Sequence, residues 1–385
     1  MTLSESLALA RHRLQTWAWE SGASARQRPA AALRFAPGAA RKLLLVSRPD
    51  PICQSQMFPF HFYKEALRER WGYEVLEIGL ATLLKEPHLA PRDADVVCFQ
   101  AWIDQTPDDQ RAIVALLREH HPGARVALFD PCAPADLRFA AAVGDRVDLY
   151  VKKHLLADLS DYDRPTGGDT NLTDWYGTYY GEPLPQTHFP LPPGFKDKLL
   201  LGPSFVTAPY MLPRFFAVQE APVGGTRRYD LHARLGGMGA NRSWYEKMRT
   251  QAFERVRGLQ GVTVTPQTPV GKRAYMREMG QSRICFSPFG YGEVCWRDYE
   301  AVFSGALLLK PDMSHMRTDP DVFVPNETYV PLRWDFTDLD DQVAAYLGNE
   351  RRRLEIARNA WEAMHRYARS GRFVDQHARL LAPGG

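Results

Sequence analysis

Short apolar runs and amphipathic stretches alternate along the first half of this chain. The apolar runs are nearly continuous, which is typical of buried strands, and in the stretches between them apolar residues recur every three or four positions, as in helices. The predicted strands are 42–46, 73–79, 94–100, 124–130 and 146–153, and the predicted helices are 62–72 and 108–123. Such alternation predicts a parallel sheet covered on both faces.

The same pattern begins again at residue 229. The predicted strands are 229–235, 261–266, 283–289, 306–311 and 327–332, and the predicted helices are 242–259, 272–282 and 297–305. Two successive halves of this kind predict an α/β protein with two Rossmann-like domains that face each other across a cleft. A long amphipathic helix at 349–370 is predicted to cross back onto the first domain.

Four segments follow from these patterns. Residues 1–40 are predicted to be an N-terminal helix and linker, 41–225 and 226–350 the two Rossmann-like domains, and 351–385 the crossing helix. Between about 155 and 225 the chain is rich in Pro, Gly and aromatic residues. This stretch is too long for a plain connection, so it is predicted to form loops beside the cleft.

The N-terminal stretch carries one apolar stripe at helical spacing. The stripe consists of Leu3, Leu7, Ala10, Leu14 and Trp17. The helix is expected to pack on its own protein. Contact with a partner helix or a membrane surface is the alternative, because Arg11 and Arg13 flank the stripe.

Length and composition describe a globular chain. At 385 residues two domains are expected. The five cysteines are scattered without a C-x-x-C pair, which argues against disulfides and structural zinc and suggests a cytoplasmic location. The net charge is only +3, and six arginines against two acids lie in the first 41 residues. The nearly neutral remainder leads us to expect no nucleic-acid partner.

Cofactor motifs are missing where they are normally found. The first predicted strand is followed by SRPDPICQSQ rather than by G-x-G-x-x-G, so no nicotinamide or flavin is expected. No D-x-D pair follows an apolar strand in a manner that suggests a metal-bridged diphosphate. No cofactor and no metal are therefore predicted.

The stretch CFSPFGYGEVCWRDYEAVFSGALLLKP, residues 285–311, joins a strand, a glycine-containing loop, a charged helix start and a second strand. Ligands of open α/β sheets bind at such strand ends, and the N-terminus of a helix favours phosphate. Gly290 and Gly292 allow close backbone approach, and Arg297 can bind a diphosphate with its planar fork. An acid one turn into the helix can accept hydrogen bonds from sugar or ribose hydroxyls. The combination suits a nucleotide sugar.

This stretch resembles the donor-site segment of GT-B fold glycosyltransferases, in particular the exostosin-like and group 1 patterns. The matching residues are Ser282, Cys285, Pro288, Gly290, Arg297, Glu300, Ala301, Gly305 and Pro311. The resemblance implies that Glu300 binds the ribose of the donor. Retaining members often have a further Glu eight positions earlier, but Glu293 is seven positions before Glu300, so the stereochemical outcome stays open.

The resemblance also places the donor in the second domain. The second-domain turn at 236–239 is similar to the diphosphate loop of the same enzymes, which implies Arg242 and Lys247 as its basic residues, with Arg234, inside the preceding strand, as the alternative. The candidate donor-binding residues are Gly236, Arg242, Lys247, Ser287, Gly290, Gly292, Glu293, Arg297, Asp298 and Glu300. Glu293 or Asp298 is expected to hold the sugar.

The acceptor is then expected to bind the first domain. A carboxylate or imidazole there can deprotonate its hydroxyl. The candidates are Asp50 and Asp130, at the carboxyl ends of predicted strands, and His61, at the start of the first predicted helix. Asp169, Asp174 and the aromatic residues of TDWYGTYYGE can line a sugar subsite, although a plain loop is the simpler reading.

The predicted function is transfer of a sugar from a nucleotide sugar to a glycan or small-molecule acceptor, in bacterial surface polysaccharide synthesis. A nucleotide-sugar epimerase and a non-catalytic binding protein of the same fold are the alternatives. Oligomeric state, donor base and sugar are left open.

Overall fold

The computed structural model describes residues 30–236 and 243–382 of the chain. The predicted N-terminal helix, with its proposed membrane contact, and Arg242 lie outside the described residues. None of the described helices is both long and apolar enough to cross a membrane.

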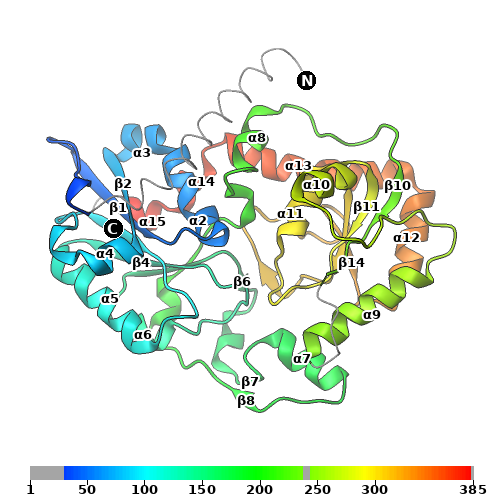
Figure 1. The fold of residues 1–385 in the computed structure, drawn as a ribbon, viewed down its shortest axis with the longest axis horizontal. Coiled ribbons are helices and arrows are strands. Elements are labelled where there is room, and N and C mark those ends of the chain that lie inside the picture. Colours follow the sequence, from blue (N-terminus) through cyan, green and yellow to red (C-terminus); the bar gives the residue numbers. More distant parts are fainter. Residues whose placement is uncertain (1–29, 237–242, 383–385) are drawn as a thin grey trace.

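The first half is built on a six-stranded parallel sheet with strand order β2-β1-β3-β4-β5-β9 (Figure 1). Its strands are β1 (Arg41–Ser47), β2 (Tyr73–Gly79), β3 (Val96–Phe99), β4 (Arg125–Asp130), β5 (Leu149–Lys152) and β9 (Leu199–Leu201). The five strands predicted for this half all belong to this sheet, and the short β9 is added at its edge.

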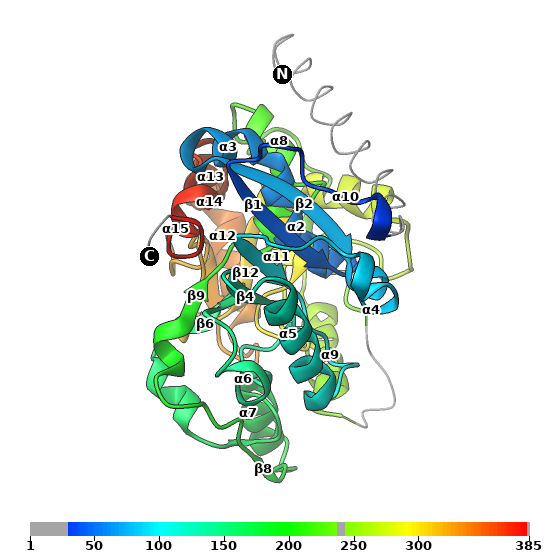
Figure 2. The ribbon, with the colours of Figure 1, turned by 90° about the vertical axis from the view of Figure 1, so that its left-hand side faces the viewer.

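Helices cover both faces of this sheet, as Figure 2 shows. Leu43 and Leu45 of β1 pack toward α2 (Pro51–Phe62), α3 (Lys64–Trp71) and the C-terminal helices. Leu44 and Val46 pack on the other face, toward α4 (Leu80–Lys85), α5 (Pro107–His120) and α6 (Ala140–Val143). Successive side chains of a strand point to opposite faces of the sheet. A continuous apolar run therefore contributes to the hydrophobic core on each face.

The first helix begins earlier than the sequence pattern predicted. The Asp50 side chain accepts a hydrogen bond from the Ile52 amide at 2.7 Å, and Pro51 occupies the first turn, where a missing N–H costs nothing. His61 therefore lies in the last turn of α2 and not at the start of a helix. Its predicted place at the start of the first helix was therefore wrong.

The second half contains a four-stranded parallel sheet of order β10-β11-β12-β14. The strands are β10 (Tyr229–His232), β11 (Ser282–Phe286), β12 (Leu307–Pro311) and β14 (Val330–Leu332). Its helices are α9 (Trp244–Gly258), α10 (Lys272–Gly280), α11 (Trp296–Phe303) and α12 (Leu339–Gly348). The strand predicted at 261–266 is reduced to a single bridge between Val264 and Leu231.

The C-terminal helices return to the first half. They are α13 (Glu350–Arg369), α14 (Arg372–Gln376) and α15 (Ala378–Leu381). The Tyr63 hydroxyl donates to the Ala368 carbonyl at 2.6 Å, and the Tyr73 hydroxyl donates to Leu381 at 3.0 Å. Phe373 packs edge-on against Phe60, 4.9 Å between ring centroids.

The segment between the two sheets contains short elements rather than loops alone. They are β6 (Leu155–Leu156), β7 (Thr166–Gly167), α7 (Asn171–Tyr179), β8 (Gln186–Thr187) and α8 (Leu212–Ala217). Helix α7 lies against the second half, where the Tyr176 ring stacks on Trp244 at 5.5 Å. Strand β6 pairs antiparallel with β13 (Met316–Arg317), so the halves are joined by backbone hydrogen bonds as well.

The predicted α/β fold of two Rossmann-like halves is confirmed. Both sheets are parallel, and Figure 1 shows them side by side with their helices around them.

Candidate functional site

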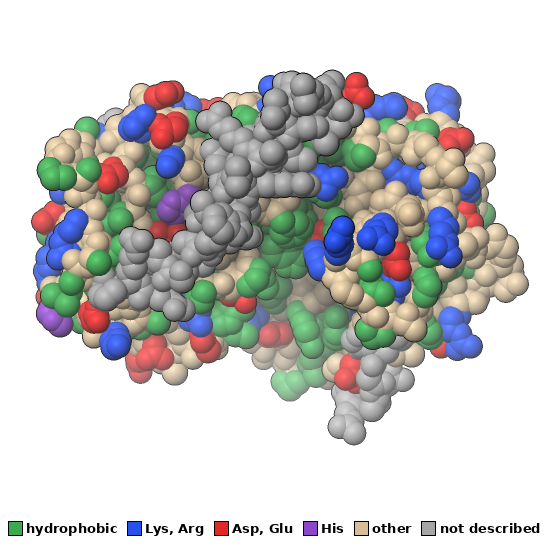
Figure 3. All heavy atoms as spheres, turned by 45° about the horizontal axis from the view of Figure 1, so that its top comes forward, with side chains coloured by type: hydrophobic (Ala, Val, Ile, Leu, Met, Phe, Trp, Pro, Cys, Tyr) green, Lys and Arg blue, Asp and Glu red, His purple; other side chains and the backbone are tan. Residues whose placement is uncertain are grey.

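Two cavities lie where the halves meet. The arginine cavity, about 690 Å³, is lined by Arg249, Lys272, Arg297 and Glu300 together with Tyr210 and Trp296. The tryptophan cavity, about 740 Å³, is lined by Trp175, Tyr179 and Trp334 together with Asp174, Asp312 and His315. Figure 3 shows basic side chains on the second half beside the hollow between the halves.

Two arginines supply positive charge to the arginine cavity. The Arg249 Nε donates to the Gly236 carbonyl at 2.8 Å, and the Arg297 Nη2 donates to the Arg234 carbonyl at 2.8 Å. Among the described residues no carboxylate pairs with either guanidinium. Burial, and then the charge of Arg297, lowers the pKa of Arg249 to about 10. Two adjacent cations without an anion suit a diphosphate.

Glu300 sits beside these arginines in α11. Its side chain is 2 % exposed, and the Tyr210 hydroxyl donates to Oε1 at 2.8 Å. Lys272 forms an ion pair with the same oxygen. Tyr210 and Pro51, which also lines the cavity, come from the first half. The cavity is thus not confined to the second half, where sequence reasoning placed every donor contact.

The side chains of Asp298 and Ser287 form hydrogen bonds at the start of α11. The Ser287 hydroxyl donates to Asp298 Oδ1 at 2.6 Å, and the Cys295 amide donates to Oδ2 at 2.8 Å. Lys310 lies 3.0 Å from the same carboxylate, and Asp298, Ser287 and Lys310 are all fully buried. This network caps and neutralises the helix start. We therefore leave Asp298 and Ser287 out of the proposed donor contacts.

Gly290 and Gly292 differ in what surrounds them. Gly290 lines the arginine cavity. A Cβ at Gly292 would come within 2.0 Å of the Ala133 carbonyl oxygen, in the loop that follows β4 of the first half. Gly292 therefore lies at a close backbone contact between the two halves, rather than at a place where backbone meets a ligand.

Gly292→Ala should force the halves apart at this contact. A backbone carbonyl cannot move as a flexible side chain can, so we expect a loss of about 1–3 kcal/mol in unfolding free energy. Chemical denaturation measures it. Gly290→Ala is the matched control, because its nearest atom is the Cys295 sulfur at 3.3 Å. Equal stability of the two variants would contradict the contact.

Lys247 points away from the arginine cavity. It forms an ion pair with Glu182 at 2.5 Å, on the segment that follows α7. Its charge is thereby neutralised, so we leave it out of the site. Gly236 lies at the cavity through its carbonyl contact with Arg249. Arg242 lies outside the described residues.

Glu293 is fully buried and faces two imidazoles. Its Oε2 is 4.0 Å from His154 Nε2, and its Oε1 is 3.9 Å from His315 Nε2. The pairing of β6 with β13 brings the two histidines together, because His154 and His315 each directly precede one of these strands. Both carboxylate oxygens, and the Nε2 atoms of both histidines, are buried without a hydrogen-bond partner among the described residues.

The charge states in this group follow from its surroundings. Burial raises the pKa of the Glu293 carboxyl, but His315 and His154 offset this, so its pKa is lowered overall and it is a carboxylate at neutral pH. Burial lowers the pKa of His154 to about 3, so that imidazole is neutral. A buried carboxylate without hydrogen bonds is costly, so such a group calls for an explanation, and a catalytic role is one.

Asp130 is fully engaged in the first half. Its carboxylate accepts hydrogen bonds from Lys152 Nζ at 2.7 Å, the Tyr150 hydroxyl at 2.7 Å and the Cys132 amide at 2.8 Å. The side chain is 0 % exposed. A buried carboxylate already satisfied by three donors cannot also collect a proton from an acceptor, so we withdraw it as a base.

His61 and Asp50 lie apart from each other. His61 Nε2 is 2.7 Å from Glu77 on β2, away from both cavities, and we withdraw it as a base as well. Asp50 is exposed and directly precedes Pro51, which borders the arginine cavity. Asp50 thus remains a candidate base at that rim.

Sequence reasoning missed Arg249, His154 and His315. Arg249 lies in α9, two residues beyond Lys247, whereas the sequence led us to look for the basic residue at positions 242 and 247. The two histidines sit outside the long apolar strands, and only the two-residue pairing of β6 with β13 relates them. Within residues 30–236 and 243–382 no cluster of His, Cys, Asp or Glu is arranged to hold a metal ion.

Comparison with known proteins yields structures only. No family model and no curated protein matches the sequence. An alpha-glucosyltransferase in complex with UDP-glucose and DNA is similar in structure, with a TM-score of 0.49 and 10% identity, over 89% of this chain and 99% of the other. The Anabaena protein HepE in complex with UDP has a TM-score of 0.45 and 9% identity, over 89% and 99%.

A third similar structure is a putative UDP-N-acetylglucosamine 2-epimerase from Listeria monocytogenes. Its TM-score is 0.42 at 12% identity, over 88% of this chain and 97% of the other. Likeness at such identities concerns the fold alone. The two facing parallel sheets and the returning C-terminal helix make that fold GT-B, as the resemblance implied.

One expectation is overturned by these structures. We expected no nucleic-acid partner from the nearly neutral charge of the chain. Several of the similar structures hold DNA together with UDP or UDP-glucose. Proteins of similar fold can therefore hold DNA, and the expectation of no nucleic-acid partner was wrong.

Proposed function

We propose that this protein is a glycosyltransferase that moves a sugar from a nucleoside-diphosphate sugar to a hydroxyl-bearing acceptor. The observation that carries the proposal is the arginine cavity, where Arg249 and Arg297 lie unneutralised beside the buried carboxylate Glu300. The arginines suit the diphosphate and Glu300 suits ribose hydroxyls. Aromatic rings of Tyr210 and Trp296 can pack against the base.

The transfer itself is assigned to the region around Glu293. The bond between sugar C1 and the diphosphate oxygen breaks, and its electron pair leaves with the nucleoside diphosphate. The acceptor oxygen forms the new bond to C1, and its proton passes to His315. The Glu293 carboxylate stabilises positive charge that develops on the sugar and on the His315 imidazole.

Arg249 and Arg297 favour departure of the diphosphate, because their charge stabilises the negative charge that it gains. No metal is needed in this scheme. The predicted role in bacterial surface polysaccharide synthesis and the predicted cytoplasmic location remain predictions.

Glu300→Ala tests the donor site. Loss of hydrogen bonds to ribose should weaken UDP binding by about ten- to a hundredfold, measured by calorimetry. Glu278→Ala is the control, because Glu278 also holds a partly buried ion pair, with Arg234, but lies outside the cavity. UDP binding that is unchanged in Glu300→Ala, or equally weakened in both variants, would contradict the assignment.

Release of nucleoside diphosphate separates the reaction classes. A transferase should release UDP in proportion to glycosylated product when acceptor is added. An epimerase of the same fold should interconvert sugars without accumulating UDP in this proportion, and a binding protein should do neither. ADP and GDP sugars are included in the same assay, because the proposed contacts of Arg249 and Arg297 with the diphosphate do not depend on which base the nucleotide carries.

A further inference from the structure

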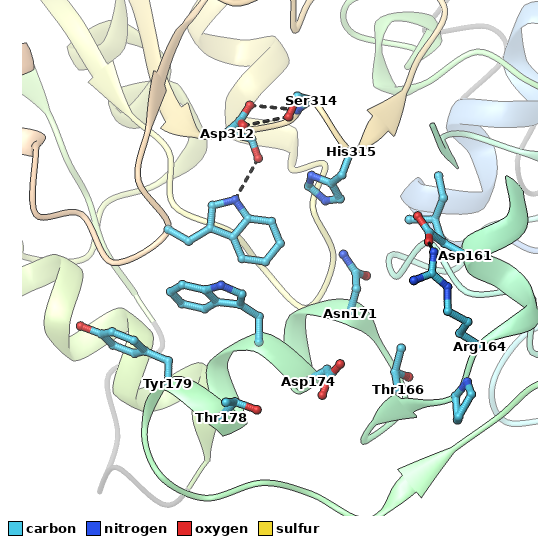
Figure 4. A pocket seen from close by; sticks show the side chains of 14 residues that line it. Asp161, Arg164, Thr166, Asn171, Asp174, Thr178, Tyr179, Asp312, Ser314 and His315 are labelled. Atoms are coloured by element: carbon cyan, nitrogen blue, oxygen red, sulfur yellow. Dashed lines mark hydrogen bonds and ion pairs between the residues drawn. The ribbon is translucent and has the colours of Figure 1, made fainter. Parts of the chain in front are cut away.

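The tryptophan cavity has a wall of aromatic rings. Trp175 lies 5.3 Å from Trp334 and stacks with Tyr179 at 5.0 Å between ring centroids (Figure 4). Trp175 and Tyr179 are 37% and 44% exposed, although both are large and apolar. They project from α7, which belongs to the first half of the chain and packs against the second half. Exposed aromatic faces in a cavity are typical of a ligand site.

Polar groups complete the cavity beside these rings. Figure 4 shows Asn171 and Asp174 on α7, with His315 across from Asn171. Asp312 lies on the opposite wall and accepts hydrogen bonds from Ser314, 2.9 Å from its amide and 2.8 Å from its hydroxyl. Carboxylate and amide groups of this kind are suited to binding hydroxyls. An ionised carboxylate can only accept a hydrogen bond, and a hydroxyl can donate one.

The cavity has the opposite charge to the arginine cavity. Asp161, Asp174 and Asp312 contribute three carboxylates, and Arg164, which is paired with Asp161, contributes one cation. This excess of negative charge disfavours a phosphate group. A neutral, hydroxyl-rich ring with one apolar face satisfies both the carboxylates and the indoles.

The cavity also reaches the group assigned to the transfer. His315 lines it, and the unpartnered Nε2 of His315 is 3.9 Å from the buried carboxylate of Glu293. A hydroxyl held in this cavity can therefore meet the imidazole, while the loop that carries Glu293 also contributes Gly290 to the arginine cavity.

We infer that the tryptophan cavity is the acceptor site, and that the acceptor is a neutral carbohydrate whose ring stacks on Trp175 and whose hydroxyls bind Asp174. The inference rests on the proposed function. In the transfer, a hydroxyl of this carbohydrate forms the bond to C1 of the donor sugar as the bond from C1 to the diphosphate breaks. Its proton passes to His315.

The test is an array of neutral glycans and of glycans bearing phosphate or sulfate, probed with the full chain in saturating UDP. Neutral glycans should bind and the anionic ones should not. For the strongest-binding array glycan, Trp175→Ala should raise the dissociation constant at least about tenfold, whereas Trp175→Phe should retain most of the affinity.

Asp174→Asn should also weaken glycan binding, with Asp340→Asn, on the exposed face of α12, as the matched control. UDP affinity should be unchanged in all four variants. This second readout separates a local effect from misfolding.

The outcomes distinguish the two proposals. If the wild-type chain binds UDP but no neutral glycan, or if Trp175→Ala binds glycan normally, the acceptor site is wrong while the proposed function stands. If a DNA duplex rather than a glycan binds and loses affinity in Trp175→Ala, the substrate class is wrong. If the wild-type chain binds no nucleoside diphosphate, the proposed function fails and the inference falls with it.

Discussion

Replacing both Arg249 and Arg297 by alanine should abolish measurable binding of nucleoside diphosphate. Hydrogen bonds to charged groups contribute about 1.5–3 kcal/mol each, so each single substitution should raise the dissociation constant about ten- to a hundredfold. Removing the two together should multiply these effects or exceed them, because both guanidiniums face one ligand. Calorimetric titration of UDP measures the result.

The fold should tolerate the change, since the two like charges repel each other and burial lowers the pKa of Arg249. Arg353→Ala is the control. Arg353 is also buried, at 5% exposed, but donates to the Tyr346 carbonyl on α12, away from both cavities. Retained UDP affinity in the double variant would remove the arginine cavity from the donor site and leave the proposed function without its main support.

The variant Arg297→Lys tests whether the charge of Arg297 alone is enough for binding of the diphosphate. Arg297 forms no ion pair with its neighbours Asp298 and Glu300. Instead Nη2 donates to the Arg234 carbonyl, and Nε has no partner in the part of the chain that the structure describes. An ammonium group keeps the charge but lacks the planar fork with which a guanidinium can hold that carbonyl and a diphosphate in fixed directions. UDP affinity should therefore fall in Arg297→Lys nearly as far as in Arg297→Ala.

Local pattern was enough to predict most of the architecture. The apolar runs of β1, β4 and β12 are long and bounded by turns, so their assignment depends only on nearby residues. The C-terminal helix was also predictable, because a long amphipathic helix needs an apolar surface to cover. The missed start of α2 at Pro51 had a local signal as well, the Asp-Pro pair, which reads as a loop unless the capping hydrogen bond is considered.

The site was only partly predictable for a different reason. Arg297 and Glu300 lie in one short helix, so their separation in the sequence determines how far apart they lie in the structure. Asp298 lies between them and looked equivalent, but its role depends on Lys310, which a neighbouring strand brings to it. His154 and His315 are far apart in the chain and meet through a two-residue strand pair that carries no sequence signal of its own.

His315→Gln should lower turnover by about a hundredfold or more and leave UDP affinity unchanged, because general base catalysis acts in the transition state alone. Glu293→Gln should have a similar effect. It keeps the volume of the side chain but removes the carboxylate that faces both imidazoles. Release of UDP in the presence of acceptor measures turnover, and calorimetry measures binding.

His365→Gln is the matched control, since that partly buried imidazole bonds to the Phe215 carbonyl at 2.6 Å, far from the cavities. Asp50→Asn tests the competing base at the rim of the arginine cavity. If turnover falls in Asp50→Asn and stays normal in His315→Gln, the proton passes to Asp50 and our assignment is wrong. If His315→Gln instead loses UDP affinity, His315 belongs to the donor site, and the two cavities do not divide donor from acceptor.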